Sequence, residues 1–331
     1  MTTTHGLGSA VRGGRRGAVA LAGAAGALAA RYLRGRARVE RSQVSGVAQR
    51  LGDIGEVESL TVLPLVERLA DRPGLRAEPG VCYLLRAGDA SVLFDCGLAR
   101  GKGPTVLEVN ASALGVSAKD VSAVVISHLH LDHVGGVRAQ LRRSFDVPEA
   151  LGLPSTVPAF VPTDMTHPSA DVSVVSVARV IAPGMAVLPP LERMLFWLGP
   201  IAEQAMVVNV RGFGLVLVTG CGHPRIERTL AACELALDLP MRAVVGGLHL
   251  PVHPLGTPLL PQAVLGNPNW PWRPIGEADA RAAIDVIDAV GPKIVALSSH
   301  DSTPWTYDAF RAAFGQRYST LRAGEPLLIS S

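Results

Sequence analysis

Cysteine is scarce in this sequence. Four cysteines occur in 331 residues, and no two of them form a CxxC pair. Their spacing excludes a dense disulfide framework. Cys82, Cys96 and Cys233 are expected to be small buried hydrophobic side chains, which is the commonest fate of a free cysteine. The fourth, Cys221, lies in the sequence Thr-Gly-Cys-Gly-His.

A long hydrophobic run is also lacking near the N-terminus. The uncharged, alanine-dominated segment 17–30 has fourteen residues, whereas a helix needs roughly 20 residues to cross a bilayer. Arg15 and Arg16 precede this segment, and five arginines follow it between residues 31 and 41. The short run and the arginine pair are typical of an export signal, but the second basic cluster opposes clean translocation.

Acidic residues are nearly absent from the same part of the chain. Residues 1–50 hold nine arginines and one acid, a net charge of +8, whereas the whole chain carries +3, which leaves −5 for residues 51–331. We therefore divide the chain into a basic, Ala-rich arm, residues 1–50, and a catalytic domain, residues 51–331. The arm has three interpretations: an export signal, a helix on an anionic membrane surface, or a disordered extension outside the fold.

These interpretations set the expected location and partners. The protein is cytoplasmic, or it is exported or membrane-associated through the arm. Membrane-surface contact through the arm is one candidate interaction. Nucleic acid is not an expected partner, because aromatic side chains that would stack on bases do not alternate with the arginines.

Three of the nine histidines lie within one stretch of six residues. The motif consists of His128, His130, Asp132 and His133, followed by Gly135 and Gly136. It follows an apolar, β-branched run, residues 121–127, that reads as a buried strand. His128 and His130 are two residues apart, so in an extended chain they point to one side and can share a cation. Asp132 and His133 fall on the turn and can face a second one. Imidazole and carboxylate groups bind zinc and, less selectively, iron or manganese, so this motif predicts a metal site.

The HxHxDH motif and its strand resemble the signature of the metallo-β-lactamase fold, a four-layer αβ/βα sandwich with one or two metal ions at one edge. Residues 92–97 (VLFDCG) are similar to another strand of that family. Four further segments are similar to a branch named after a dihydropterin-linked aminobenzene ribofuranosyl phosphate synthase of pterin biosynthesis. These segments are 110–116, 203–205 (EQA), 218–224 (VTGCGHP) and 246–250 (GGLHL). The resemblance covers roughly residues 57–325 and implies an α/β fold.

The resemblance also implies further ligands. His223, in the Thr-Gly-Cys-Gly-His turn, and His300, at a strand end, should complete a centre of two divalent cations, with zinc ahead of iron or manganese. Cys221 stands where many relatives carry a bridging aspartate. A thiolate there would favour zinc, and a buried unligated thiol is the alternative. His249 is a candidate ligand or proton donor, and a histidine satisfied by backbone partners is the alternative.

One familiar family feature is absent. Many hydrolases of this fold carry a histidine some twenty residues before the position of Cys221, but no histidine occurs between His167 and His223. Either His223 takes over that role or one metal is weakly held. Glu203 is a candidate metal ligand or a partner of a ligand. The more ordinary interpretation is an acid that caps a helix or forms a salt bridge. Asp95 should accept the second N–H of a ligand histidine and so orient it.

Apolar runs and helical spacing predict an alternation of elements after residue 57. The predicted strands are 57–62, 80–86, 90–95, 204–210, 214–219, 243–247 and 293–299, and the predicted helices are 105–114, 137–143, 226–237, 277–290 and 307–314. Residues 146–200 are rich in proline and lack a regular period, so they are expected to contain loops that shape the cleft. Residues 250–274, also rich in proline, are expected to form a loop over the site. Trp270 and Trp272 in the second loop are candidate substrate contacts, although packing is the more common role of tryptophan.

The predicted chemistry follows from the metals. Divalent cations lower the pKa of bound water from about 16 to about 7. We expect a metal-bound hydroxide to attack an ester, phosphoester or related small-molecule substrate, with Asp132 orienting the nucleophile. Two alternatives are a transferase that forms a C–N bond on a dihydropterin diphosphate, as the branch name implies, and a non-catalytic metal-binding or sensing module.

Overall fold

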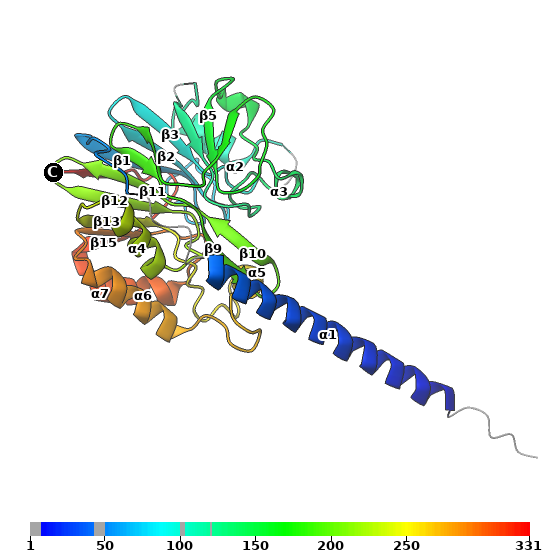
Figure 1. The fold of residues 1–331 in the computed structure, drawn as a ribbon. Helices are drawn as coiled ribbons and strands as arrows, with labels where there is room; N and C mark the ends of the chain where they lie inside the picture. Colours follow the sequence, from blue (N-terminus) through cyan, green and yellow to red (C-terminus); the bar gives the residue numbers. More distant parts are fainter. Residues whose placement is uncertain (1–7, 43–49, 100–102, 120) are drawn as a thin grey trace, which may run out of the picture.

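Two seven-stranded sheets form the centre of the molecule (Figure 1). The computed structural model describes residues 8–42, 50–99, 103–119 and 121–331. In the first sheet the strand order is β16-β1-β2-β3-β4-β5-β6. Its strands are β1 (Ser59–Val66), β2 (Cys82–Ala87), β3 (Ala90–Phe94), β4 (Ala123–Val125), β5 (Pro158–Val161), β6 (Asp171–Val174) and β16 (Leu327–Ser330). The strands from β3 to β6 run parallel.

The second sheet has the order β15-β14-β13-β12-β11-β8-β7. Its strands are β7 (Arg179–Ala182), β8 (Met185–Val187), β11 (Met206–Val210), β12 (Gly214–Thr219), β13 (Met241–Gly246), β14 (Ile294–Leu297) and β15 (Tyr318–Thr320). The strands from β12 to β15 run parallel. A separate hairpin pairs β9 (Leu191–Leu195) with β10 (Gly199–Glu203).

The two sheets pack face to face through one apolar core. Val92 and Phe94 of the first sheet belong to the same buried cluster as Val216 and Val245 of the second. The parallel strands are covered on both faces, so their sequences are nearly continuous apolar runs rather than alternating ones. This double coverage explains why the central strands were predictable from composition.

Helices cover the outer faces of both sheets. α2 (Val106–Ala113) and α3 (Val137–Arg142) pack on the first sheet. On the second sheet lie α4 (Ile226–Ala236), α6 (Glu277–Ala289) and α7 (Pro304–Phe314). Short 3-10 turns occur at Glu149–Leu151 and Gly315–Arg317. The resulting order, helix, sheet, sheet, helix, confirms the four-layer sandwich that the resemblance implies.

Residues 146–200 contain loops, as predicted, but they also supply strands β5 to β9 and the start of β10, which were not predicted. These strands are three to five residues long, and β6 and β7 are half-exposed edge strands without a regular apolar alternation. Pro158 opens β5, a position where proline is tolerated in a strand. Residues 250–274 do form a loop, which contains one short helix, α5 (Leu260–Leu265).

The basic arm contains a long helix, α1 (Gly8–Ser42), that projects from the sandwich in Figure 1. Its C-terminal part packs on β9: Tyr32 and Val39 are buried with Met194. Gly35 lies between them on the same face. A Cβ atom at Gly35 would come within 2.4 Å of the sulfur of Met194, so glycine permits the close approach. The Tyr32 hydroxyl donates to the backbone oxygen of Pro268 at 2.6 Å.

Residues 23–42 of the arm are helical and partly buried on the domain. Residues 1–7 and 43–49 lie outside the described part of the chain, and the three interpretations of the arm stay predictions. Among the described residues, no helix combines the length and apolar character needed to cross a membrane.

Candidate metal centre

The predicted ligands lie at strand ends in both sheets. β4 of the first sheet leads into residues 128–133, whereas β12, β13 and β14 of the second lead into the segments that carry Cys221, His249 and His300. The carboxyl ends of parallel strands meet at one edge of a sheet, where sites usually form in α/β proteins. The structure therefore brings the seven predicted metal ligands to one place.

The first group of ligands, here called the imidazole cluster, consists of His128, His130 and His223. Nδ1 of His130 lies 3.0 Å from Nε2 of His128 and 3.2 Å from Nε2 of His223. Burial lowers the pKa of all three side chains, to about 4 for His130. The rings are therefore neutral near pH 7, and neutral imidazole is the form that binds a metal.

The second group, here called the mixed cluster, consists of Asp132, His133, Cys221 and His300. The Cys221 sulfur lies 3.1 Å from Nε2 of His133 and 3.1 Å from Nε2 of His300. The four ligand atoms all lie within 4.8 Å of one another. Burial raises the pKa of the Cys221 thiol, and the nearby Asp132 carboxylate raises it further.

Both clusters fit divalent cations by the chemistry of their donor atoms. Imidazole nitrogen, carboxylate oxygen and thiol sulfur are the groups that hold zinc in proteins. A buried set of such atoms facing one another costs free energy unless a cation compensates it. Nδ1 of His223 is buried without a hydrogen-bond partner. A cation would also favour the thiolate form of Cys221 that burial disfavours.

Asp95 follows β3 and lies against the mixed cluster. Its Oδ2 accepts a hydrogen bond from Nδ1 of His133 at 2.7 Å, which leaves Nε2 facing Cys221. Ser127 donates to the same carboxylate through its backbone N–H and its hydroxyl. Burial lowers the pKa of His133, but the carboxylates of Asp95 and Asp132 outweigh it and raise the value to about 9. This is the geometry of an orienting partner.

Glu67, which was not predicted, plays a similar part for His300. The Ser298 hydroxyl donates to Oε1 of Glu67 at 2.6 Å and lies 2.6 Å from Nδ1 of His300. Tyr83 and Ser299 also donate to this fully buried carboxylate. Burial raises its pKa. Glu67 directly follows β1, but it lies five residues beyond the end of the predicted strand 57–62, so an acid shortly after that strand was the available signal.

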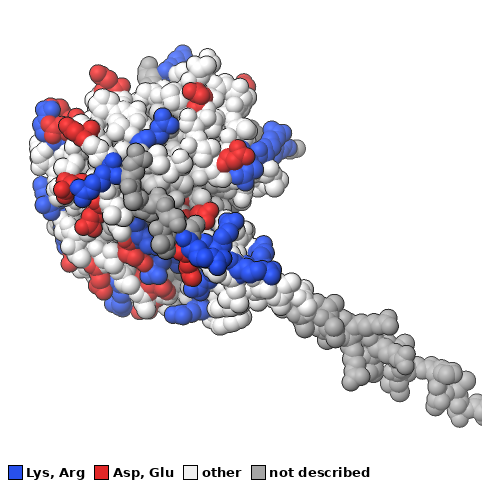
Figure 2. Space-filling model, in the orientation of Figure 1, with Lys and Arg blue, Asp and Glu red and all other residues white. Residues whose placement is uncertain are grey.

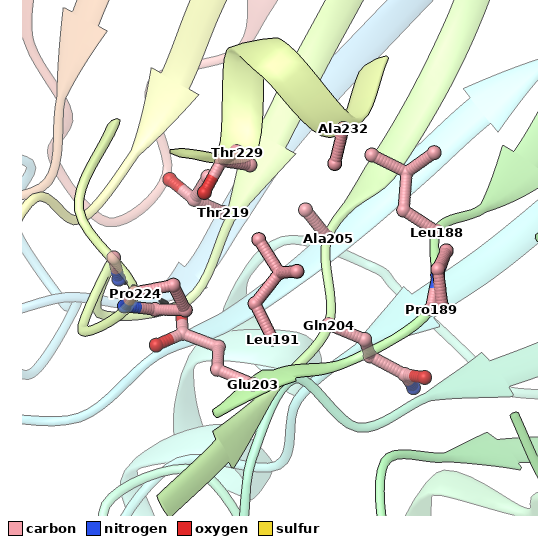
Figure 3. Close-up of a pocket in the computed structure, with 11 residues that line it drawn as sticks. Leu188, Pro189, Leu191, Glu203, Gln204, Ala205, Thr219, Pro224, Thr229 and Ala232 are labelled. Atoms are coloured by element: carbon pink, nitrogen blue, oxygen red, sulfur yellow. Dashed lines mark hydrogen bonds between the residues drawn. The ribbon is translucent and has the colours of Figure 1, made fainter. Parts of the chain in front are cut away.

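Glu203 holds the turn that carries Cys221 and His223. Its carboxylate accepts the backbone N–H of Gly222 at 2.7 Å and of His223 at 2.8 Å, and Figure 3 shows it pointing toward this turn at Pro224. Burial raises its pKa to about 7. Both carboxylate oxygens are engaged by the backbone, so Glu203 acts as a partner of the turn rather than as a member of either cluster.

His249 lies beside the imidazole cluster, with its ring centroid 4.5 Å from that of His223. Neither ring nitrogen has a hydrogen-bond partner, and burial lowers its pKa to about 3. Its backbone, at a positive φ of 50°, donates to Oδ2 of Asp301 at 2.7 Å. Asp301 is a second residue that the sequence analysis missed, although it adjoins His300. The backbone of Gly266 acts on the His249 ring in the opposite direction and raises its pKa, so a ring satisfied by a backbone partner stays the alternative prediction.

A cavity of about 540 Å³ opens beside both clusters. Five of the residues discussed above line it: His130, Asp132, Cys221, His223 and His249. The opposite wall comes from the loop 250–274, including Gln262 and Gly266. Nε2 of Gln262 donates to Oδ2 of Asp132 at 3.1 Å. The expectation that this loop covers the site is confirmed, but Gln262 itself was not predicted.

Trp270 and Trp272 are placed elsewhere. Trp270 packs edge-on against Tyr32 of α1 with ring centroids 5.1 Å apart, and it stacks on Trp272. Neither tryptophan lines the cavity. Their position does not support the prediction that they contact substrate. Trp270 packs between Tyr32 of the arm and Trp272 instead.

Comparisons with known proteins agree with this fold. A model of the metallo-beta-lactamase superfamily matches residues 75–204. Ribonuclease TTHA0252 of Thermus thermophilus is 38% identical over 73 residues, which are 22% of this chain and 16% of that protein. The probable RNase MJ4 of Methanocaldococcus jannaschii is 37% identical over 67 residues, 20% of this chain and 14% of that protein. The chain thus matches only a small part of the length of these relatives.

A solved structure, Tm1679, described as a metal-dependent hydrolase of the beta-lactamase superfamily, aligns with 82% of this chain and 100% of its own length. The sequence identity is 20% and the TM-score is 0.55, which shows a shared fold. The superfamily model thus matches a segment that includes the HxHxDH motif, and the solved structure has the same fold as this chain.

Proposed function

We propose that the protein is a metal-dependent hydrolase with two adjacent cation sites. The observation that carries the proposal is the convergence of the imidazole and mixed clusters on one cavity. The thiol of Cys221 in the mixed cluster favours zinc, because soft ligands select it over magnesium or calcium. When bound, divalent cations supply Lewis acidity and make water a nucleophile at neutral pH.

The residues around the cavity have separate tasks in this proposal. His128, His130 and His223 hold the first cation, and the mixed cluster holds the second. Asp132 faces the cavity and is fixed by Gln262, so it can orient the attacking water. His249 presents unpartnered ring nitrogens at the cavity wall, where it can exchange a proton with the leaving group.

The substrate is proposed only as a class, an ester or phosphoester. Two similar proteins are named as ribonucleases, so phosphodiesters belong in the test. The transferase alternative gains nothing from the structure, because the tryptophans that would stack a flat pterin are not among the residues that line the cavity. The likeness to the pterin-named branch rests on short sequence motifs alone.

A panel of phosphodiester, lactone, thioester, β-lactam and RNA substrates tests the proposal, with a dihydropterin diphosphate to detect a C–N adduct. Activity should disappear after chelation, return with zinc, and be absent in His130→Ala. The matched control is His253→Ala, an exposed histidine paired with Glu277, which should keep full activity. Metal binding without turnover on any substrate would favour the sensing module, and equal activity in His130→Ala would refute the proposed site.

A further inference from the structure

Exposed apolar side chains lie on three segments that line the cavity and on α1, which adjoins one of these segments through hydrogen bonds from Arg31 to the backbone oxygens of Phe196 and Trp197. Four segments, here called the mouth rim, carry them: residues 23–42 of α1, the turn 196–198 between β9 and β10, the loop 250–274, and residues 137–143, which are α3 and the residue after it. Leu198 and Leu265 line the cavity and are also 48% and 46% exposed. The apolar wall of the cavity is thus continuous with the apolar outer surface.

The exposed side chains come from every segment of the mouth rim. Leu141 of α3 is 80% exposed and Trp272 of the loop is 76% exposed. The remaining large exposed apolar side chains of the rim are Leu33, Val137, Trp197, Leu255, Leu260 and Val264. Scattered exposed leucines are common, but so many around one cavity mouth mark an interaction surface.

The mouth rim is also strongly basic. Its four segments contain nine arginines and a single acidic residue, Glu40, although residues 51–331 as a whole carry net negative charge. Figure 2 shows basic side chains on both sides of a hollow at the right of the molecule. Among the described residues, Arg34, Arg138 and Arg142 have no ion pair with an acid. Their charge is available to a partner.

We propose that the mouth rim docks the protein on an anionic lipid surface and that the cavity takes an amphiphile with a long apolar chain from that surface. Arginine flanking exposed leucine and tryptophan is the pattern of a membrane-interface surface, because the apolar groups enter the acyl boundary while the cations meet the lipid phosphates. The second half of the inference, the substrate class, rests on the proposed hydrolase function.

The cavity wall supports an amphiphile over a polar substrate. Leucine and proline side chains make up much of it: Pro79, Leu98, Leu131, Leu198, Pro258, Pro261 and Leu265. The polar groups gather at the clusters, where a head group would lie. Apart from Trp197 and Trp272, a ribonucleic acid would meet aliphatic surface at the mouth rim, and its phosphates would have to enter an apolar cavity.

Vesicle cosedimentation of the full chain tests the docking. Vesicles of phosphatidylglycerol and phosphatidylcholine should bind it, and pure phosphatidylcholine vesicles should bind it far less. Arg34→Gln, Arg138→Gln and Arg142→Gln should each weaken binding about fivefold, and together about 100-fold. Arg86→Gln, an exposed arginine on β2, is the matched control and should change nothing. His130→Ala should bind vesicles like the wild type, so failure of the hydrolase proposal would not affect this result.

Two further measurements complete the test. Brominated lipid should quench fluorescence in the wild type more than in Trp272→Phe, because Trp272 enters the lipid. A dansylated undecanoic acid should bind the cavity, and Leu198→Asn with Leu265→Asn should weaken it at least tenfold. Absence of vesicle binding, equal binding by the arginine variants, or RNA binding in its place would overturn the docking. A dimer that buries Trp272 without lipid would also overturn it, and failure of the dansyl probe would overturn the substrate class.

Discussion

Nε2 of His133 lies 3.1 Å from the sulfur of Cys221. The two residues are 88 positions apart and come from different sheets. This contact places a thiol at the centre of the mixed cluster, between two imidazoles. A sulfur ligand would give a bound metal a charge-transfer absorption band that an oxygen ligand at the same position would not give.

The first prediction concerns this sulfur. Cobalt bound in place of zinc should give an intense near-ultraviolet absorption band from the thiolate, because sulfur transfers charge to the metal. Cys221→Ser should lose that band and bind zinc more weakly, whereas Cys233→Ser, a buried cysteine of the core behind the second sheet, should keep it. An unchanged band in Cys221→Ser would show that the thiol is not a ligand.

Asp95→Asn should lower zinc affinity by about 10- to 100-fold, the usual effect of removing a partner of a ligand histidine. The physical reason is the loss of the negative charge that accepts Nδ1–H of His133 and orients its ring. A competition titration with a chelating dye measures it. Asp89→Asn, in the exposed turn between β2 and β3, serves as the control, and equal affinities in both variants would contradict the assigned role.

Glu67→Ala should lower the free energy of unfolding of the metal-free protein by about 3 kcal/mol or more. Several buried donors lose their acceptor, and each donor left without an acceptor costs roughly 1–3 kcal/mol. Urea unfolding gives the value. Glu58→Ala removes an exposed ion pair with Arg211 and should cost less than about 1 kcal/mol. Similar losses in the two variants would mean that the Glu67 network is not a stabilising one.

Gly266→Ala should disturb the loop over the site without unfolding the sandwich. The new Cβ would lie 2.4 Å from Nε2 of His249, so the ring or the loop must shift, and misplacement of about 1 Å can cost as much as 100-fold in rate. Proteolysis within residues 250–274 should become faster. Gly52→Ala, with open space around its Cβ position, should behave like the wild type, and identical loop cleavage in the two variants would argue against a close fit at Gly266.

The stability of the metal-free protein should depend on the protonation of His249. Burial lowers its pKa to about 3 in the folded protein, whereas the unfolded value is about 6.5. Below pH 6.5 the unfolded chain binds a proton that the folded chain does not, so this group destabilises the fold by about 1.4 kcal/mol per pH unit down to pH 3.

His249→Gln removes that group. The free energy of unfolding of the variant, minus that of the wild type, should be about 2 kcal/mol more positive at pH 5 than at pH 7.5. Urea midpoints at the two pH values, in the presence of a chelator, give both differences. A constant difference between the two proteins would show that His249 has an ordinary pKa.

The part of the site that the sequence predicted is local. The HxHxDH motif follows a buried strand, and Cys221, His223 and His300 follow others, so strand ends together with the resemblance were enough to expect them at one edge. The short or edge strands between residues 158 and 195 escaped prediction because strands of this kind lack a long apolar run.

The part that escaped prediction depends on distant contacts. Glu67 and Ser298 meet across 231 residues, and Gln262 reaches Asp132 across 130. Neither pairing leaves a pattern in the local sequence, because a buried acid looks like any other acid until its partners are known. The position of Trp270 escaped prediction for the same reason, because its neighbour Tyr32 belongs to the distant arm.

The two clusters divide their ligands between the halves of the chain: four residues precede position 134, and three follow position 220. Each half alone therefore holds an incomplete coordination shell. A cation bound with its full set of ligands reports that both halves have folded and docked, and metal content becomes a measure of assembly as well as of chemistry.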